Sequence, residues 1–187
     1  MGLILASQSP RRRELMRLVA ENFAVDDAGV QEDGVHAATP CLLAETLARA
    51  KAEAVFARRS ADVVLGCDTV VEVQGATLGK PQDAEEAVRM LALLANRWHQ
   101  VHTGLCLCAP GQAPVVFCES TRVQMAAVPA EEILAYAATE EPYDKAGGYG
   151  VQGWAARYIT RLEGCYYNVM GLPVARLYHE LHSRGYV

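Results

Sequence analysis

The run Val63-Val64-Leu65-Gly66-Cys67 constrains the fold of this chain most strongly, because five successive residues without a polar side chain have the length of a strand. A strand that alternates apolar and polar residues can face water on one side. A continuous apolar run is instead typical of a strand buried on both faces of its sheet. The run therefore predicts a sheet with covering layers on both sides.

Strand and helix signals alternate along the rest of the chain. Ser9-Pro10 and Thr39-Pro40 each combine an N-cap residue with proline at the first helical position. Apolar patterns and Gly/Pro breaks predict strands at residues 3–6, 63–67, 69–73, 76–78, 99–108, 115–128 and 158–162. Helices are predicted to begin at Pro10 and to span residues 41–59, 84–95, 129–139 and 173–183. Two hairpins interrupt the alternation, so we expect an α/β fold whose mixed sheet has flanking helices. No linker-like or repeated segment occurs, which predicts one domain over residues 1–187.

Composition excludes several classes of protein. With 187 residues, 51% of them hydrophobic, the chain can bury a core without disulfide or metal staples. Its net charge of -5 disfavours a generic nucleic-acid or anionic-membrane binder, so neither partner is expected. No apolar run approaches the ~20 residues of a transmembrane helix. The N-terminus is hydrophobic first and basic second, the reverse of a secretory signal. We therefore expect a cytoplasmic protein.

Six cysteines stand at positions 41, 67, 106, 108, 118 and 165. None forms a C-x-x-C motif, and none lies near a histidine at zinc-finger spacing. The expectation is that they are buried free thiols in a reducing compartment.

Three arginines, Arg11-Arg12-Arg13, occupy the first turn of the predicted opening helix. Cations at this positive end of the helix dipole are locally unfavourable. One interpretation is a solvated basic turn that tolerates the repulsion between its charges. The functional interpretation is an anion site, in which the helix amides, the hydroxyls of Ser7 and Ser9 and the guanidinium groups bind phosphate. The chain lacks the P-loop and dinucleotide-binding motifs, so neither explains such a site.

Asp68 directly follows the apolar run. A carboxylate at the end of a buried strand is well placed to act as a catalytic base or metal ligand, although it could equally cap a turn. Lys51, on the long helix, and Lys80 are further cations, but single lysines are usually solvated.

A glycine-rich segment spans Asp144–Gly153, with four glycines among its last seven residues. Such a backbone can approach a ligand closely, or it can be an ordinary surface loop. Tyr149 could then be a packing residue and Gln152 a solvated amide. A later segment, Cys165–Pro173, indicates a structured turn into the last helix and packing more than chemistry.

Five motifs occur in order along the chain. They are Leu5-Ala6-Ser7-Gln8-Ser9-Pro10-Arg11-Arg12, Gly66-Cys67-Asp68-Thr69-Val70-Val71, Leu78-Gly79-Lys80-Pro81, Asp144–Gly153 and Tyr167-Asn168-Val169-Met170-Gly171-Leu172-Pro173. In these motifs, over essentially its whole length, the chain resembles the Maf family of nucleoside triphosphate pyrophosphatases. The resemblance implies an inosine triphosphate pyrophosphatase-like fold, with an elongated mixed β-sheet and a deep central cleft. It also implies a homodimer.

The resemblance further implies hydrolysis of a nucleoside triphosphate between its α- and β-phosphates, giving a monophosphate and pyrophosphate. Asp68 matches the family's proton acceptor, and a divalent cation, Mg²⁺ or Mn²⁺, is the implied cofactor. Glu32 and Asp68 are the implied metal ligands, with Asp33 as a further candidate because Gln31 stands where many members carry an acid. The implied substrate-binding residues are Ser7, Arg11, Arg12, Lys51, Thr69, Lys80 and Gln152.

Three positions indicate the base preference. Arg11, Thr69 and Gln152 match the branch of the family that prefers dTTP and UTP, with modified pyrimidine nucleotides as further candidates. The alternative branch hydrolyses 7-methyl-GTP and typically carries Trp, Gln and Glu at these places. A non-catalytic nucleotide-binding regulator of septum formation is another alternative. Asp68 weighs against it, since binding a polyanion requires no general base.

Overall fold

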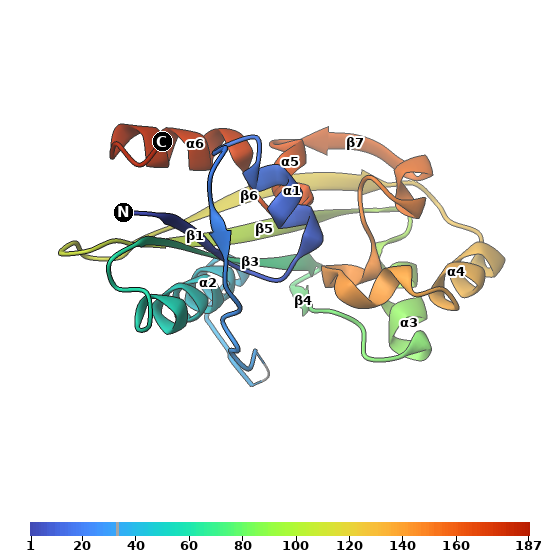
Figure 1. Ribbon diagram of the computed structural model, residues 1–187. Helices are drawn as coiled ribbons and strands as arrows, with labels where there is room; N and C mark the ends of the chain where they lie inside the picture. The colour runs from blue at the N-terminus through green and yellow to red at the C-terminus, as the bar shows by residue number, and fades with distance from the viewer. Residues whose placement is uncertain (33) are drawn as a thin grey trace.

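One seven-stranded mixed β-sheet forms the centre of the molecule (Figure 1). The structure is a computed structural model that describes residues 1–32 and 34–187. Its strands are β1 (Leu3–Ala6), β2 (Ala24–Val25), β3 (Val63–Val73), β4 (Ala76–Leu78), β5 (Arg97–Cys108), β6 (Val115–Met125) and β7 (Ile159–Glu163). The helices are α1 (Pro10–Met16), α2 (Pro40–Phe56), α3 (Ala84–Leu94), α4 (Ala130–Ala137), α5 (Tyr166–Val169) and α6 (Val174–Ser183). None of these helices is both long and apolar enough to cross a membrane.

The strand order is β2-β1-β3-β5-β6-β7, with β4 also paired to β3. β1 is parallel to β2 and β3, whereas β3, β5, β6 and β7 are successively antiparallel. This arrangement confirms the predicted mixed sheet with flanking helices. The tight turn at Gln74-Gly75, where φ is 52° and 80°, joins β3 to β4 as the two-residue hairpin requires.

The two faces of the sheet pack against different helices, as the continuous apolar run predicts. On β1 and β3, alternate residues such as Ile4 and Val64 join a core cluster with α2. Their neighbours Leu5 and Leu65 join a second cluster with α1 and α6 on the opposite face. Strands at the centre of the sheet are therefore buried on both sides, and Figure 1 shows α2 and α6 on opposite sides of the sheet.

Two glycines let α2 lie unusually close to the sheet. A Cβ atom on Gly66 would lie 2.1 Å from the carbonyl oxygen of Ala48, and one on Gly104 would lie 2.2 Å from the carbonyl carbon of Ala44. These distances are far below van der Waals contact, so any larger residue would push the helix away. The close approach brings the side chains of α2 directly against β3, β5 and β6.

The strand that carries Asp68 differs from the sequence expectation of two separate segments. β3 is continuous through Asp68 and Thr69, which pair with Gly104 and Thr103 of β5. The long strand β5 pairs with β3 on both sides of these polar residues. Local sequence patterns do not predict this pairing, because β5 is distant in the sequence. Asp68 is therefore held within the sheet and does not cap a turn.

The cysteine expectation is wrong for two of the six residues. Cys41 and Cys118 form a disulfide with a Cα–Cα distance of 6.0 Å. Their sequence separation of 77 residues carries no local signal, and the close approach of α2 to the sheet brings them together. The other four are free thiols, of which Cys165 is only partly buried, contrary to the expectation. Cys67 is fully buried, and burial raises its pKa to about 11.

Candidate active site

A buried cluster of charges lies between α2 and β3. The Lys51 Nζ is 2.5 Å from Asp68 Oδ1 and 2.7 Å from Glu32 Oε1. The Lys51 and Asp68 side chains are only 9% and 8% exposed, whereas Glu32, before α2, is 38% exposed. Lys51 reaches this position because it shares the sheet-facing side of α2 with small residues such as Ala48 and Ala52. One lysine therefore bridges two carboxylates that come from distant parts of the sequence.

The surroundings separate the acidities of these two carboxyl groups. Burial raises the pKa of Asp68, although Lys51 and Arg12 partly oppose it. Burial acts on Glu32 in the same direction, but the hydrogen bond and charge of Lys51, followed by Lys80 and Arg12, hold its pKa below the ordinary value. Two carboxyl groups whose pKa values are pushed apart are suited to different tasks. Asp68 is the better proton acceptor, and Glu32 is the more persistent anion.

The same two carboxylates have the chemistry of a divalent-cation site. Their oxygen atoms converge on a single positively charged atom, Lys51 Nζ, from two sides. Mg²⁺ and Mn²⁺ prefer such oxygen ligands, and Mg²⁺ usually binds one or two carboxylates together with water and phosphate. The residues present thus fit the cation that the sequence implies. Asp33, the additional candidate ligand, lies outside the described residues.

Arg12 joins the end of β1 to the carboxylate strand. Its guanidinium donates to Thr69 Oγ1 at 2.9 Å, to the carbonyl oxygen of Gly171 at 2.8 Å and to Ser7 Oγ at 3.4 Å. Ser9 caps α1 by accepting from the Arg12 amide, and Pro10 begins the helix as expected. Gly171 has a φ of 107°, a left-handed conformation that favours glycine, and it presents its carbonyl to the arginine. The first turn of α1 is therefore a polar site built around Ser7, Arg12 and Thr69.

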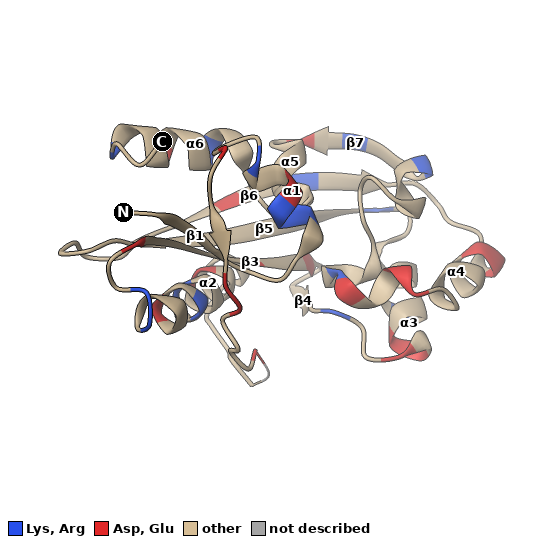
Figure 2. Cartoon of the chain, viewed as in Figure 1, with Lys and Arg blue, Asp and Glu red and all other residues tan. Residues whose placement is uncertain are grey.

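Arg11 has a different set of partners. It donates to Asp144 Oδ2 at 2.7 Å and to the Asp144 carbonyl oxygen at 3.1 Å, which ties α1 to the glycine-rich segment. Lys145 also contacts the Asp144 carboxylate, at 2.7 Å. Figure 2 shows this basic first turn of α1 near the middle of the sheet, while acidic residues gather on α3 and α4. Of the two adjacent arginines, Arg11 thus contacts the glycine-rich segment and Arg12 contacts β3.

This division predicts different effects on stability. Arg12→Ala removes a half-buried group that satisfies a backbone carbonyl and a threonine hydroxyl, and should lower the unfolding free energy by about 1–3 kcal/mol. Arg11→Ala breaks a pair whose acidic member is 54% exposed, and should cost less than about 1 kcal/mol. Urea unfolding of both variants measures the difference. Equal losses would contradict the assignment.

The glycine-rich segment, predicted as a loop, contains a short 3₁₀ turn at Ala146–Gly148, and a second one at Glu141–Asp144 leads into it. Tyr149 is buried, and its hydroxyl lies 2.5 Å from His99 Nε2, which confirms a packing role. Burial lowers the pKa of His99 to about 4, so this histidine is neutral at pH 7. Gln152 is exposed on a turn of the same segment. Among the described residues, no hydrogen bond joins Gln152 to Asp68 or Arg12.

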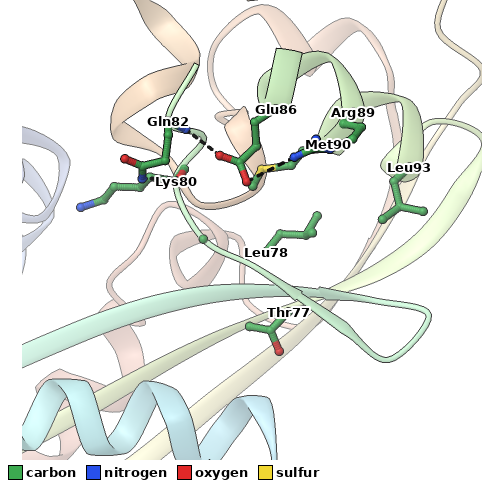
Figure 3. Close-up of a pocket in the computed structure, with 9 residues that line it drawn as sticks. Thr77, Leu78, Lys80, Gln82, Glu86, Arg89, Met90 and Leu93 are labelled. Atoms are coloured by element: carbon green, nitrogen blue, oxygen red, sulfur yellow. Dashed lines mark hydrogen bonds and ion pairs between the residues drawn. The ribbon is translucent and has the colours of Figure 1, made fainter. Parts of the chain in front are cut away.

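Lys80 follows β4 and is exposed. Its charge acts on Glu32, which places it on the border of the carboxylate cluster. A cavity of about 440 Å³ lies behind this segment, against α3, and is lined by groups including Leu78 and Met90 (Figure 3). Lys80 itself borders this cavity together with polar residues such as Gln82, although its amine points away from Leu78 in this view. The cavity is therefore a neighbour of the site, and the deep central cleft implied by the resemblance stays a prediction.

The residues that support Thr69 from behind carry almost no signal in the sequence. Thr103 Oγ1 lies 3.0 Å from Thr69 Oγ1 and donates to the carbonyl oxygen of Asn168 at 3.1 Å. Asn168 is fully buried and donates to the Val101 carbonyl oxygen and to Thr121 Oγ1, both at 3.0 Å. The only available signal was a polar residue inside an apolar motif before the last helix. These contacts fix the loop that carries Gly171 against the sheet.

Comparison with known proteins gives a consistent result over the whole chain. A family profile described as "Maf-like protein" matches residues 2–184. A dTTP/UTP pyrophosphatase of Carboxydothermus hydrogenoformans is 46% identical over 187 residues, covering 100% of both chains. A dTTP/UTP pyrophosphatase of Symbiobacterium thermophilum is 49% identical over 184 residues, covering 98% of this chain and 94% of the relative.

Solved structures support the fold. The Ham1 protein of Staphylococcus aureus aligns with a TM-score of 0.58 at 16% identity, covering 98% of this chain and all of that one. A HAM1 protein of Coxiella burnetii aligns with a TM-score of 0.53 at 14% identity, covering 98% and 99%. At such identities the likeness concerns the arrangement of strands and helices alone.

Proposed function

This chain belongs to the Maf-like family, and we propose that it hydrolyses dTTP and UTP to the nucleoside monophosphate and pyrophosphate. The observation that carries the proposal is the buried Asp68 carboxylate, 2.5 Å from Lys51 Nζ. Burial raises its pKa, and the cations around it can receive a polyanion. A hydrolase acting on an acid anhydride needs both properties in one place.

In this proposal Asp68 accepts the proton of the attacking water. The water oxygen forms a bond to the α-phosphorus while the bond from that phosphorus to the pyrophosphate oxygen breaks. Lys51, Lys80 and Arg12 offset the roughly four negative charges of the triphosphate, which would otherwise repel the nucleophile. Arg12 can bind phosphate through its guanidinium, and Ser7 lies beside it as a further donor. Substrate binding would exchange part of the Lys51 and Arg12 contacts for phosphate oxygens.

We further propose that Glu32 and Asp68 hold Mg²⁺ or Mn²⁺. Such an ion supplies charge neutralisation at the phosphates when bound. Glu32 suits this role because Lys51, Lys80 and Arg12 hold its pKa below the ordinary carboxyl value, which favours the charged form that binds a cation. Lys51 would remain as the fixed cation of the site, since its buried position depends on α2 and not on the substrate.

Pyrophosphate release across a panel of nucleoside triphosphates, with Mg²⁺ and Mn²⁺ in turn, tests the function. We expect the highest kcat/KM with dTTP, UTP or a modified pyrimidine nucleotide, and a monophosphate as the second product. Preference for 7-methyl-GTP would place the chain in the other branch of the family. Tight nucleotide binding with no turnover would instead support the regulator that the sequence left open.

Selectivity between bases is proposed to depend on Gln152. The edge of uracil or thymine presents an N3–H donor beside carbonyl acceptors, and a neutral amide can satisfy one donor and one acceptor together. A carboxylate would oppose the acceptor. Gln152→Glu should therefore lower the UTP-to-GTP ratio of kcat/KM by about tenfold or more, at roughly 1–3 kcal/mol per unsatisfied group.

The matched control is Gln112→Glu, an exposed glutamine in the turn between β5 and β6. It adds the same charge far along the sheet from Asp68 and should leave the ratio unchanged. If the Gln152 variant also stays within about twofold of the wild type, the residue has no part in selectivity.

The setting of the protein is part of the proposal. We propose a homodimer that acts in the cytoplasm. The single sheet, which takes strands from residue 3 to residue 163, supports one domain over residues 1–187. Light scattering coupled to size-exclusion chromatography distinguishes a dimer from a monomer directly.

A further inference from the structure

A second group of metal-ligating side chains lies on the α2-facing side of the sheet, where Cys118 is two strands across from Asp68. Cys41 comes from the first turn of α2, His102 from β5 and Cys118 from β6. One ligand atom from each of the three lies within 4.8 Å of the others. The Cys41–Cys118 disulfide holds two of these atoms together. None of these residues takes part in the proposed hydrolysis.

The strand register explains why the three side chains meet. His102 pairs with Ser120, and Gly104 pairs with Cys118, so all four positions share one face of the sheet. That face packs against α2, and the missing side chain of Gly104 admits the helix at Ala44, close to Cys41. The cluster is thus held by the central sheet and by the start of a helix, and its geometry does not depend on a loop.

The surroundings of the His102 imidazole suit a metal ligand. His102 is 6% exposed, and its Nδ1 lies 2.8 Å from Ser120 Oγ. The Ser120 oxygen lies 3.7 Å from Cys41 Sγ. Its Nε2 is buried without a hydrogen-bond partner in the described part of the chain, 3.6 Å from Glu72 Oε2. A carboxylate behind one imidazole nitrogen is the arrangement that orients a metal-binding histidine.

We propose that Cys41, Cys118 and His102, after reduction of the disulfide, bind a thiophilic cation such as Zn²⁺. A dithiol reductant supplies two electrons and two protons, is itself oxidised to a disulfide, and leaves two thiols. Binding of the cation to both sulfur atoms then releases the two thiol protons, and a ring nitrogen of His102 is the third ligand. Water can complete the tetrahedral set, because Cys41 and Cys118 are only partly buried.

The chemistry of the donors separates this site from the one at Asp68. Two thiolates and an imidazole select Zn²⁺ over Mg²⁺, whereas Glu32 and Asp68 offer only oxygen. Tetrahedral ligands at zinc–sulfur distances of about 2.3 Å place two sulfur atoms about 3.8 Å apart. The Cα–Cα distance of 6.0 Å lets the reduced side chains separate to that extent by rotation about their own bonds. The cation would replace the disulfide as the link between the start of α2 and β6.

Cobalt titration of the full-length reduced protein, under nitrogen, tests the proposal. The expected result is one Co²⁺ per chain with a thiolate-to-metal charge-transfer absorption, abolished by equimolar Zn²⁺. Cys41→Ser and Cys118→Ser should each weaken binding by more than about 100-fold, and His102→Gln by about 10–100-fold. Zn²⁺ at about 100 times its Kd should raise the melting temperature of the reduced wild type by about 5–10 °C.

Control variants distinguish the site at Cys41, His102 and Cys118 from the other thiols and carboxylates of the chain. Cys165→Ser alters a free, partly exposed thiol and should change nothing. Glu32→Gln should retain the absorption, because an oxygen-only site cannot produce it. Cys108→Ala tests the neighbouring pair Cys106 and Cys108, whose sulfur atoms are 4.0 Å apart. Absence of the absorption in the reduced wild type, its persistence without Cys41 or Cys118, or its loss in the Cys108 variant would overturn the proposal.

Discussion

Asp68→Asn is expected to lower the turnover of dTTP and UTP by about 10²–10⁴-fold, the usual contribution of a general base. Asparagine has nearly the same shape but cannot accept a proton. Lys51 keeps Glu32 as a partner in this variant, so its charge is not left unpaired. The unfolding free energy at pH 7 should therefore stay within about 1 kcal/mol of the wild type, and nucleotide binding should persist.

Steady-state kinetics and urea unfolding of the same preparation measure both effects. The control is Asp62→Asn, since Asp62 accepts a hydrogen bond from the Gly2 amide at 2.7 Å that an asparagine oxygen can also accept. Turnover close to the wild-type value in the Asp68 variant would remove this residue from the role of base.

The dependence of kcat/KM on pH tests the same role of Asp68. Because burial raises the pKa of Asp68, the acid limb of kcat/KM should lie above the ordinary carboxyl value of 3.8. Activity should fall as the pH drops through that raised pKa, since the protonated form cannot accept a proton. The Asp68 variant should have lost this limb from its residual activity.

Lys51→Met is expected to have the largest effect on stability. It removes the cation shared by Asp68 and Glu32 and leaves a buried carboxylate without its nearest counter-charge. Breaking a buried pair from one side typically costs roughly 3–5 kcal/mol, and we expect a loss of that size at pH 7.5. Turnover should also fall, because the substrate loses a fixed positive charge.

The sign of the pH dependence identifies the cause. The pKa of Asp68 is already raised in the folded protein, and removing Lys51 raises it further. The folded state then binds the proton more tightly than the unfolded chain, so stability is lost as the pH rises through the folded pKa and returns below it. Urea unfolding at pH 5 and pH 7.5 should show a smaller deficit at the lower pH.

The control for this prediction is Lys80→Met, which removes an exposed lysine and should change stability by less than about 0.5 kcal/mol. A Lys51 deficit that is equal at both pH values would indicate lost packing of the side chain and not an uncompensated carboxylate.

The sequence determined the layers of the fold and the identity of the charged groups. The apolar run before Asp68 required cover on both faces, and Ser9-Pro10 and Thr39-Pro40 marked the helix starts as found. These features depend on local patterns, in which each residue's preference is set by its near neighbours. The order of five motifs was enough to identify the family, because each lies at a fixed place along the chain.

Which of these groups are in contact depends on the tertiary structure. Arg11 and Arg12 are adjacent in sequence, yet one contacts Asp144 and the other contacts Thr69 and Gly171. The Cys41–Cys118 disulfide likewise joins residues 77 positions apart. Such contacts follow from strand register and from the close approach of α2 to the sheet, which depend on pairings across the whole chain. Local preference supplies the charged groups, but only the packed sheet sets the distances that give them their pKa values and partners.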